Sequence, residues 1–268
     1  IGAYGAESAP DEYGIPENEP RITVSSGTFL PMDGKQDWRV MDLHLADISR
    51  ANTSIGGSAD MQRLLFLRLK IEGFETGLGW SHWNTDKLMA IDQMAVVACE
   101  ISDSASNIAF VGGERLAVLG NCLRDARTSH VLRVWQAYRS VISCNIVSGS
   151  SVNSADGRHA LKLHGPGYRP AFGGNPAADE YGQPVPETTL LANRSENSVI
   201  SDNVFGSSGP WPVFIGPQDE WTCARACRAQ GAASKAMPVR GYLQLSSQTS
   251  AMQPSYAACS GLHLPWLS

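Results

Sequence analysis

The sequence VISCNI at residues 141–146 and the sequence VISDNV at residues 199–204 decide the fold, because they are two copies of one pattern. The pattern recurs earlier in the chain as VVACEI at residues 96–101 and as VLGNCL at residues 118–123. Self-similarity at a period of about two dozen residues, carried by β-branched side chains, is typical of a solenoid in which each repeat is one coil. Equivalent residues of successive coils then lie above one another. Aligning the repeats therefore predicts which distant residues form a column.

The rest of the chain up to residue 219 has the same character. Short apolar strands alternate with turns rich in Gly, Asn, Ser and Asp, without a convincing helical period. We therefore predict an all-β fold, a single-stranded right-handed parallel β-helix (β-solenoid) over residues 1–219, incomplete at both ends. Asn145 and Asn203 end the two best copies of the repeat, and we expect them to stack at a corner and bond turn amides. Ligand binding by these two amides is the weaker alternative.

Two segments depart from the repeat. A Gly- and Pro-rich stretch at residues 165–197 is predicted to be a long loop inserted into the solenoid, since loops of this length are usually functional or disordered. From residue 221 onward the chain contains no Asp or Glu, and its strand pattern stops. Residues 220–268 are predicted to be an atypical tail, irregular or disordered. A cap on the solenoid and a shifted reading frame in the source gene are the alternatives.

Composition excludes several classes of partner. The formal net charge of −5 and the isoelectric point near 5.7 provide no basic stripe, so we expect no nucleic-acid partner. No apolar run reaches the ~18 residues of a membrane-spanning helix, so we expect no membrane span. The six cysteines show neither paired metal-ligand spacing nor a dense disulfide framework.

Aligning the first strand of each coil predicts an outward column that contains two cations. The flanking residues are apolar and should face inward, so strand alternation sends the central residues outward. These central residues are Ala90, Phe110, Arg133, Lys162 and Phe214. The next outward column, two residues further on, is Asp92, Gly112, Trp135, His164 and Gly216. Arg133 and Lys162 are thus predicted to be neighbours one coil apart, although 29 positions separate them.

This pair suits an acidic sugar, and the matching chemistry is β-elimination of a uronate. That reaction needs a base for the proton next to the carboxylate, a cation to neutralise the carboxylate, and an acid for the leaving oxygen. Lys162 is the predicted base, because a neighbouring positive charge lowers the pKa of a lysine. Arg133 is predicted to bind the carboxylate, and His164 to protonate the leaving oxygen.

Aromatic and histidine side chains near this pair, or in the two long loops that interrupt the repeat at residues 72–86 and 165–197, are the predicted substrate-binding residues. They are Trp80, Trp83, Trp135, Tyr168, His82 and His159. Aromatic rings stack on sugar faces, and both loops flank the predicted site. For His82 and His130 taken alone, an ordinary structural role is favoured. The alternative for Arg133 and Lys162 is that they are solvated surface residues, as most lysines and arginines are.

The chain resembles the right-handed parallel β-helix proteins of the pectate-lyase-like superfamily over about residues 1–219. The resemblance is carried by the opening IGAYG…EPRITV and by the repeats SVISCNIVSGS and NSVISDNVFGS. The alginate lyase and chondroitinase B group of that superfamily uses a Lys base and an Arg on neighbouring coils, with calcium beside them. Lys162 in HALKLHG is similar to that base. In that group the Arg follows the Lys by one coil, whereas here Phe214 follows and Arg133 precedes.

The resemblance implies a carbohydrate-active protein that is secreted, periplasmic or on the cell surface, and we expect a monomer. The predicted function is a polysaccharide lyase acting on a uronate-containing glycan, with an acidic polysaccharide as its partner. No cofactor is assigned; Ca²⁺ stays open, with no metal ligands identified. A non-catalytic glycan-binding or surface-adhesion solenoid is the main alternative. A polygalacturonase-like hydrolase ranks lower, because it needs two or three carboxylates and the outward columns offer only Asp92.

Overall fold

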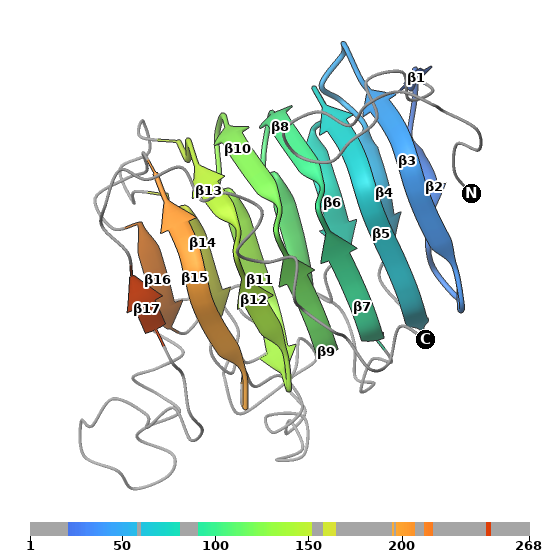
Figure 1. The fold of residues 1–268 in the computed structure, drawn as a ribbon. Helices are drawn as coiled ribbons and strands as arrows, with labels where there is room; N and C mark the ends of the chain where they lie inside the picture. The colour runs from blue at the N-terminus through green and yellow to red at the C-terminus, as the bar shows by residue number, and fades with distance from the viewer. Residues whose placement is uncertain are drawn as a thin grey trace, which may run out of the picture.

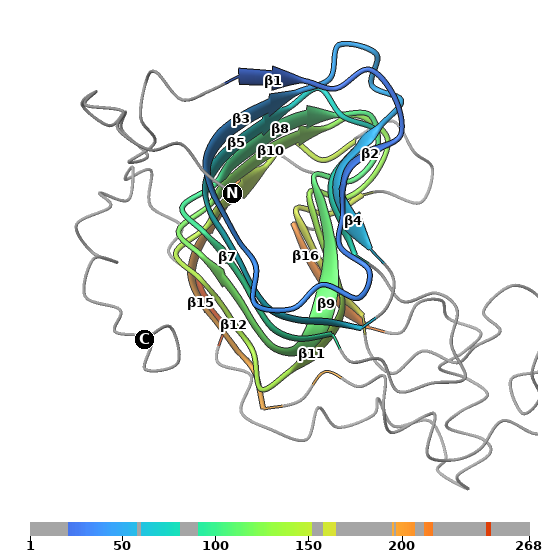
Figure 2. The same ribbon diagram turned by 90° about the vertical axis from the view of Figure 1, so that its right-hand side faces the viewer.

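The computed structural model describes residues 21–57, 60–80, 91–151, 158–164, 195, 197–206, 212–216 and 245–247. These residues contain 17 strands and no helix, and the strands join one parallel sheet. Figure 1 shows the strands stacked along one axis, and Figure 2 shows the coils winding around a shared interior. The predicted all-β solenoid of parallel strands is therefore confirmed. No helix of the described segments is long and apolar enough to cross a membrane.

The sheet has three faces, which we name A, B and C. Face A contains β1 (Arg21–Thr23), the second halves of β3 (Arg39–Ala46) and β5 (Met61–Glu72), β8 (Glu100–Ser104), β10 (Cys122–Ala126), β13 (Ile146–Ser148) and the end of β15 (Val199–Phe205). Face B contains the first halves of β3 and β5, β7 (Ile91–Val97), the second half of β9 (Ala109–Leu119), β12 (Val141–Ser143), the first half of β15 and β17 (Leu245–Ser247). Face C contains β2 (Thr28–Pro31), β4 (Thr53–Gly57), β6 (Thr76–Trp80), the first half of β9, β11 (Leu132–Tyr138), β14 (Leu161–His164) and β16 (Val213–Gly216).

Strand alternation fills the interior with apolar columns. One such column on face B consists of Val40, Phe66, Val96, Val118, Ile142 and Ile200, and all six side chains are buried. Burying an aliphatic or aromatic side chain of this size stabilises a fold by about 1.5–3 kcal/mol. The apolar residues of the sequence repeat therefore supply the core, and the polar residues between them turn the chain.

A left-handed residue forms the corner between faces B and A in every described coil. The positions are Asp42, Arg68, Ala98, Gly120, Cys144 and Asp202, with φ between 48° and 63°. A residue with a Cβ pays roughly 1–2 kcal/mol for this conformation, so something must hold each corner in place. In the later coils, the residue that follows the corner holds it in place.

Asn121, Asn145 and Asn203 follow the last three of these corners and form a buried column, here called the asparagine column. The Nδ2 of Asn145 donates to the Oδ1 of Asn203 at 2.8 Å and to the carbonyl of Val118 at 2.9 Å. Its Oδ1 accepts the backbone N–H and the Nδ2 of Asn121, at 3.0 and 2.8 Å. The predicted stacking of Asn145 and Asn203 on turn amides is confirmed.

The two segments that depart from the repeat are described only in part. Of residues 220–268, the structure describes Leu245–Ser247, which form β17 and pair in parallel with β15 through Ile200 and Leu245. From the stretch 165–197 it describes residues 195 and 197. The predicted loop and the rest of the predicted tail lie outside the described residues, and both assignments stay predictions.

Candidate functional site: a cationic column on face C

Arg133 and Lys162 lie in register on consecutive coils of face C. Arg133 of β11 pairs with Lys162 of β14, as the alignment of repeats predicts. Phe110 of β9 precedes Arg133 in the same column, and Phe214 of β16 follows Lys162. The flanking residues of these strands belong to the core or pack against it, so the four central side chains face outward. We call these four residues the cationic column.

Aromatic rings at both ends of the column position the two cations. The Cζ of Arg133 lies 4.5 Å from the ring centre of Phe110, and the Nζ of Lys162 lies 5.5 Å from that of Phe214. Such contacts contribute roughly 0.5–2 kcal/mol, more where water is excluded. Phe214, where the resemblance would place an arginine, therefore supports the lysine of the coil before it.

Two stacked histidines lie beside the column. The rings of His130 and His159 are 5.2 Å apart and nearly parallel, and His159 also stacks on Phe214 at 5.1 Å. The backbone N–H of His159 donates to the Nδ1 of His130 at 3.0 Å, so the neutral His130 carries its proton on Nε2. Burial lowers the pKa of His130 to about 2, and the positive charges of Lys162 and Arg133 add to the effect. His130 is thus a neutral ring that holds the backbone of His159.

A third cation, Arg158, belongs to this group and was missed by the alignment of repeats. Burial, together with the smaller effect of the charge of Arg158, lowers the pKa of the Arg133 guanidinium to about 10. Arg158 lies just before His159, outside the strand whose alternation defines the column. The sequence RHALKLH, in which four of seven residues are basic or histidine, is the signal that could have identified it.

Trp80 does not serve as a sugar platform, and its prediction is corrected. Its side chain is fully buried in the core and stacks on Phe66 with ring centres 5.3 Å apart. The reason is strand alternation, because Leu78 of the same strand also faces inward. Trp135 is 7% exposed, and the register of β11 against β9 shifts just after Val134. It therefore presents little ring surface to a ligand.

Asp92 also lies elsewhere than expected, which is a second correction. It belongs to β7 on face B, pairs with Gln62 and Glu114, and forms an ion pair with Arg115. The face-C strand of that coil is β6, whose Gly79 pairs with Phe110. The alignment of repeats assigns residues 90–92, and not β6, to face C in this coil. It therefore places Asp92 in the wrong column.

The remaining predicted residues are only partly described. The backbone of His164 pairs with Gly216 at the end of β14, one position beyond Leu163. Trp83, His82 and Tyr168 lie outside the described residues. In the described ranges no three His, Cys, Asp or Glu side chains form a group that could hold a metal ion, so no calcium ligand can be named there.

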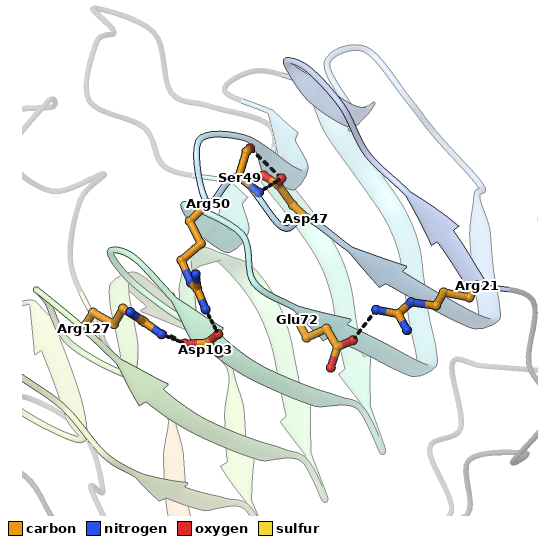
Figure 3. A network of polar contacts seen from close by, with 7 residues as sticks. All are labelled: Arg21, Asp47, Ser49, Arg50, Glu72, Asp103 and Arg127. Atoms are coloured by element: carbon orange, nitrogen blue, oxygen red, sulfur yellow. Dashed lines mark hydrogen bonds and ion pairs between the residues drawn. The ribbon is translucent and has the colours of Figure 1, made fainter.

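On face A and the turns beside it, positive and negative side chains are paired. Figure 3 shows Arg21 paired with Glu72, and Asp103 paired with both Arg50 and Arg127. The carboxylate of Asp47 accepts the backbone N–H and the hydroxyl of Ser49. In this network each arginine pairs with a carboxylate. The site on face C brings three cations close together, Arg133, Arg158 and Lys162.

No family model, no curated protein and no solved structure matches this chain. The function is therefore inferred from the chemistry of the site.

Proposed function

We propose that the protein binds an acidic polysaccharide at the cationic column and cleaves it by β-elimination. The observation that supports this proposal is the register of Arg133 and Lys162 on neighbouring coils, each held by a phenylalanine ring. Neighbouring strands lie about 4.8 Å apart, so one sugar residue can reach both side chains. A carboxylate is a suitable partner for such a partly buried, positively charged surface.

In the proposed reaction, Arg133 binds the uronate carboxylate through two parallel hydrogen bonds and neutralises its charge. The neutral amine of Lys162 takes the proton from the ring carbon next to that carboxylate. The electron pair forms a carbon–carbon double bond, and the bond to the glycosidic oxygen breaks. His164, two residues after Lys162 on β14, is proposed to protonate the leaving oxygen. The carboxylate and the acidic carbon are adjacent in the sugar, which is why cation and base must be adjacent in the protein.

A non-catalytic glycan-binding solenoid is the second candidate. It needs only the cations and no proton donor, and the pKa of His130, lowered to about 2 by burial, rules out that histidine as a replacement for His164. The same cations would then hold a glycan without breaking it. The hydrolase alternative is weakened, because Asp92, the carboxylate on which it rested, lies on face B.

The test is an assay of pectate, alginate and glycosaminoglycans that follows the absorbance of the unsaturated product. We expect product from at least one polymer, and a loss of about 10²- to 10⁴-fold in kcat for Lys162→Ala. Lys70→Ala is the matched control, because Lys70 lies on face A and should leave the rate unchanged. Unchanged activity in Lys162→Ala would refute the mechanism. Binding by the wild type without product would support the second candidate.

A further inference from the structure

Arg158 differs from most arginines of this protein. Eight others form an ion pair with a carboxylate: Arg21, Arg50, Arg63, Arg68, Arg115, Arg124, Arg127 and Arg139. Arg158 forms no ion pair with any described residue, and its Nε is buried without a hydrogen-bond partner. The Nε atoms of Arg50 and Arg115 are also buried without a partner, but both of those guanidinium groups form an ion pair through another nitrogen. Arg158 has no such ion pair with a described residue, and a buried guanidinium without an anion is unfavourable unless a ligand supplies one.

The backbone around Arg158 is anchored on two sides. The hydroxyl of Ser150 donates to the carbonyl of Arg158 at 3.0 Å. The next residue, His159, donates its N–H to the His130 ring, and its carbonyl accepts the N–H of Val131 at 3.2 Å. Arg158 is therefore attached to a fixed segment at the start of the coil that carries Lys162.

Arg158 directly precedes His159, whose backbone N–H bonds the His130 ring and whose own ring stacks on it. Consistent with this position, the charge of Arg158 lowers the pKa of both Arg133 and His130. Two guanidinium groups near each other repel, and the repulsion grows where water is partly excluded. One uronate carboxylate engages the fork of one arginine, so Arg133 alone can bind it. A ligand with a single anionic group needs only Arg133. The guanidinium of Arg158 is then available for a second anionic group.

We infer that Arg158 binds a second anionic group of the same glycan, so that the preferred ligand carries two acidic groups within neighbouring sugar residues. This inference rests on the proposed binding of an acidic glycan at the cationic column. Two consecutive uronates would supply the two groups, and so would one uronate beside a sulfated sugar. Both ligands share the required chemistry, a pair of anions closely spaced along the chain.

Three hexasaccharides separate these cases. Oligogalacturonate carries a carboxylate on every sugar, hyaluronan carries one on every second sugar, and chondroitin sulfate adds a sulfate to the hyaluronan-like spacing. Their dissociation constants are measured by calorimetry in the Lys162→Ala background, where the ligands stay intact, with the wild type alongside. We expect at least one of the two doubly charged ligands to bind about tenfold or more tightly than hyaluronan.

The variants Arg158→Gln and Arg158→Lys test the residue itself. Arg158→Gln should remove most of this preference while changing hyaluronan affinity less than about threefold, and Arg158→Lys should retain part of it, because it keeps the charge but not the fork. Arg127→Gln, which breaks an ion pair near face A, is the control and should have no effect. If Arg158→Gln loses the preference for oligogalacturonate, the two recognised groups are consecutive uronates. If it loses the preference for chondroitin sulfate, they are a uronate and a sulfate.

Three results would overturn the inference, and they differ from one another. If the reference protein binds all three hexasaccharides with equal affinity, no second anionic group is recognised, while the proposed function stands. If the reference protein prefers a doubly charged ligand and Arg158→Gln keeps that preference, Arg158 has no such role, while the proposed function stands. If neither the wild type nor the Lys162→Ala protein binds any of the three hexasaccharides, the proposed function fails together with the inference.

Discussion

The asparagine column and the cationic column are both stacks of polar residues on successive coils, yet they differ in how their polar groups are satisfied. In the asparagine column, each buried amide donates to a carbonyl of the preceding coil, and Asn121 and Asn145 also donate to the Oδ1 of the next asparagine. In the cationic column, positive charges lie above one another against phenylalanine rings. The first arrangement is complete without a ligand, whereas the second concentrates one sign of charge.

This difference separates a stabilising role from the proposed functional one. A fully satisfied buried network rigidifies a fold, and removing one member leaves several groups without partners. Stacked like charges contribute no such stability, and the pKa of Arg133, lowered by burial, shows that the environment disfavours its charged form. We therefore expect changes in the asparagine column to affect the free energy of unfolding, and changes in the cationic column to affect binding and turnover.

The largest effect on stability is expected for Asn145→Leu. The substitution leaves Asn121 without its acceptor, and Val118 and Asn203 without their donor, all in buried positions. At about 1–3 kcal/mol for each unsatisfied group, the free energy of unfolding should fall by about 4 kcal/mol. Urea denaturation measures the change. Asn107→Leu is the control, because the Asn107 side chain bonds only serine hydroxyls, and an equal loss there would show that the column has no special role.

A smaller effect, on activity, is expected for Phe214→Leu. The substitution removes the ring beside Lys162 and His159, so the lysine loses its position. We expect kcat/KM to fall about tenfold, and the free energy of unfolding to change by less than about 1.5 kcal/mol. Phe29→Leu, at the other end of the core, is the control. Equal activity in both variants would show that the ring does not position the lysine.

A gain in stability is expected for Cys99→Asn, which would extend the asparagine column by one coil. The N–H of Cys99 already bonds the Oδ1 of Asn121, and the Cys99 sulfur lies 3.5 Å from the N–H of Leu69 and 3.6 Å from the carbonyl of Phe66. An amide should replace these weak contacts with ordinary hydrogen bonds and raise the free energy of unfolding by about 1 kcal/mol. Cys99→Ala should lower it. A loss of stability in Cys99→Asn would contradict the view that Cys99 occupies the same position in its coil as Asn121 does in the next.

The smallest effect concerns pH. Because the pKa of His130 is lowered to about 2, the unfolded chain binds the proton more readily. Its contribution to stability is therefore complete above the unfolded pKa near 6.5 and is lost as the pH falls toward 2, by about 0.7 kcal/mol between pH 7 and pH 6. The groups that act on it, His159, Arg133, Lys162 and Arg158, are all basic. His130→Phe should show a shallower slope. NMR titration of the ring between pH 8 and pH 4 would contradict this account if His130 became protonated.

The repeats made the stacking of Asn145 on Asn203 and the Arg133–Lys162 pair predictable, because stacking depends only on spacing and alternation. The same rule should have placed Trp80 inside, since Leu78 two residues earlier is apolar. Asp92 was misplaced because β6 is a poor match to the repeat, with two glycines among five residues. Arg158 could not be placed by alternation, because it precedes β14 and its position depends on contacts with Ser150 and His159.

The most direct test of the central claim is a crystal structure of the Lys162→Ala variant soaked with an intact oligouronate. The account predicts that the glycan lies along face C, with one carboxylate bound by Arg133 and the adjacent ring carbon facing the space left by the lysine. A glycan bound on another face, or one at this column with its carboxylate turned away from Arg133, would contradict the account.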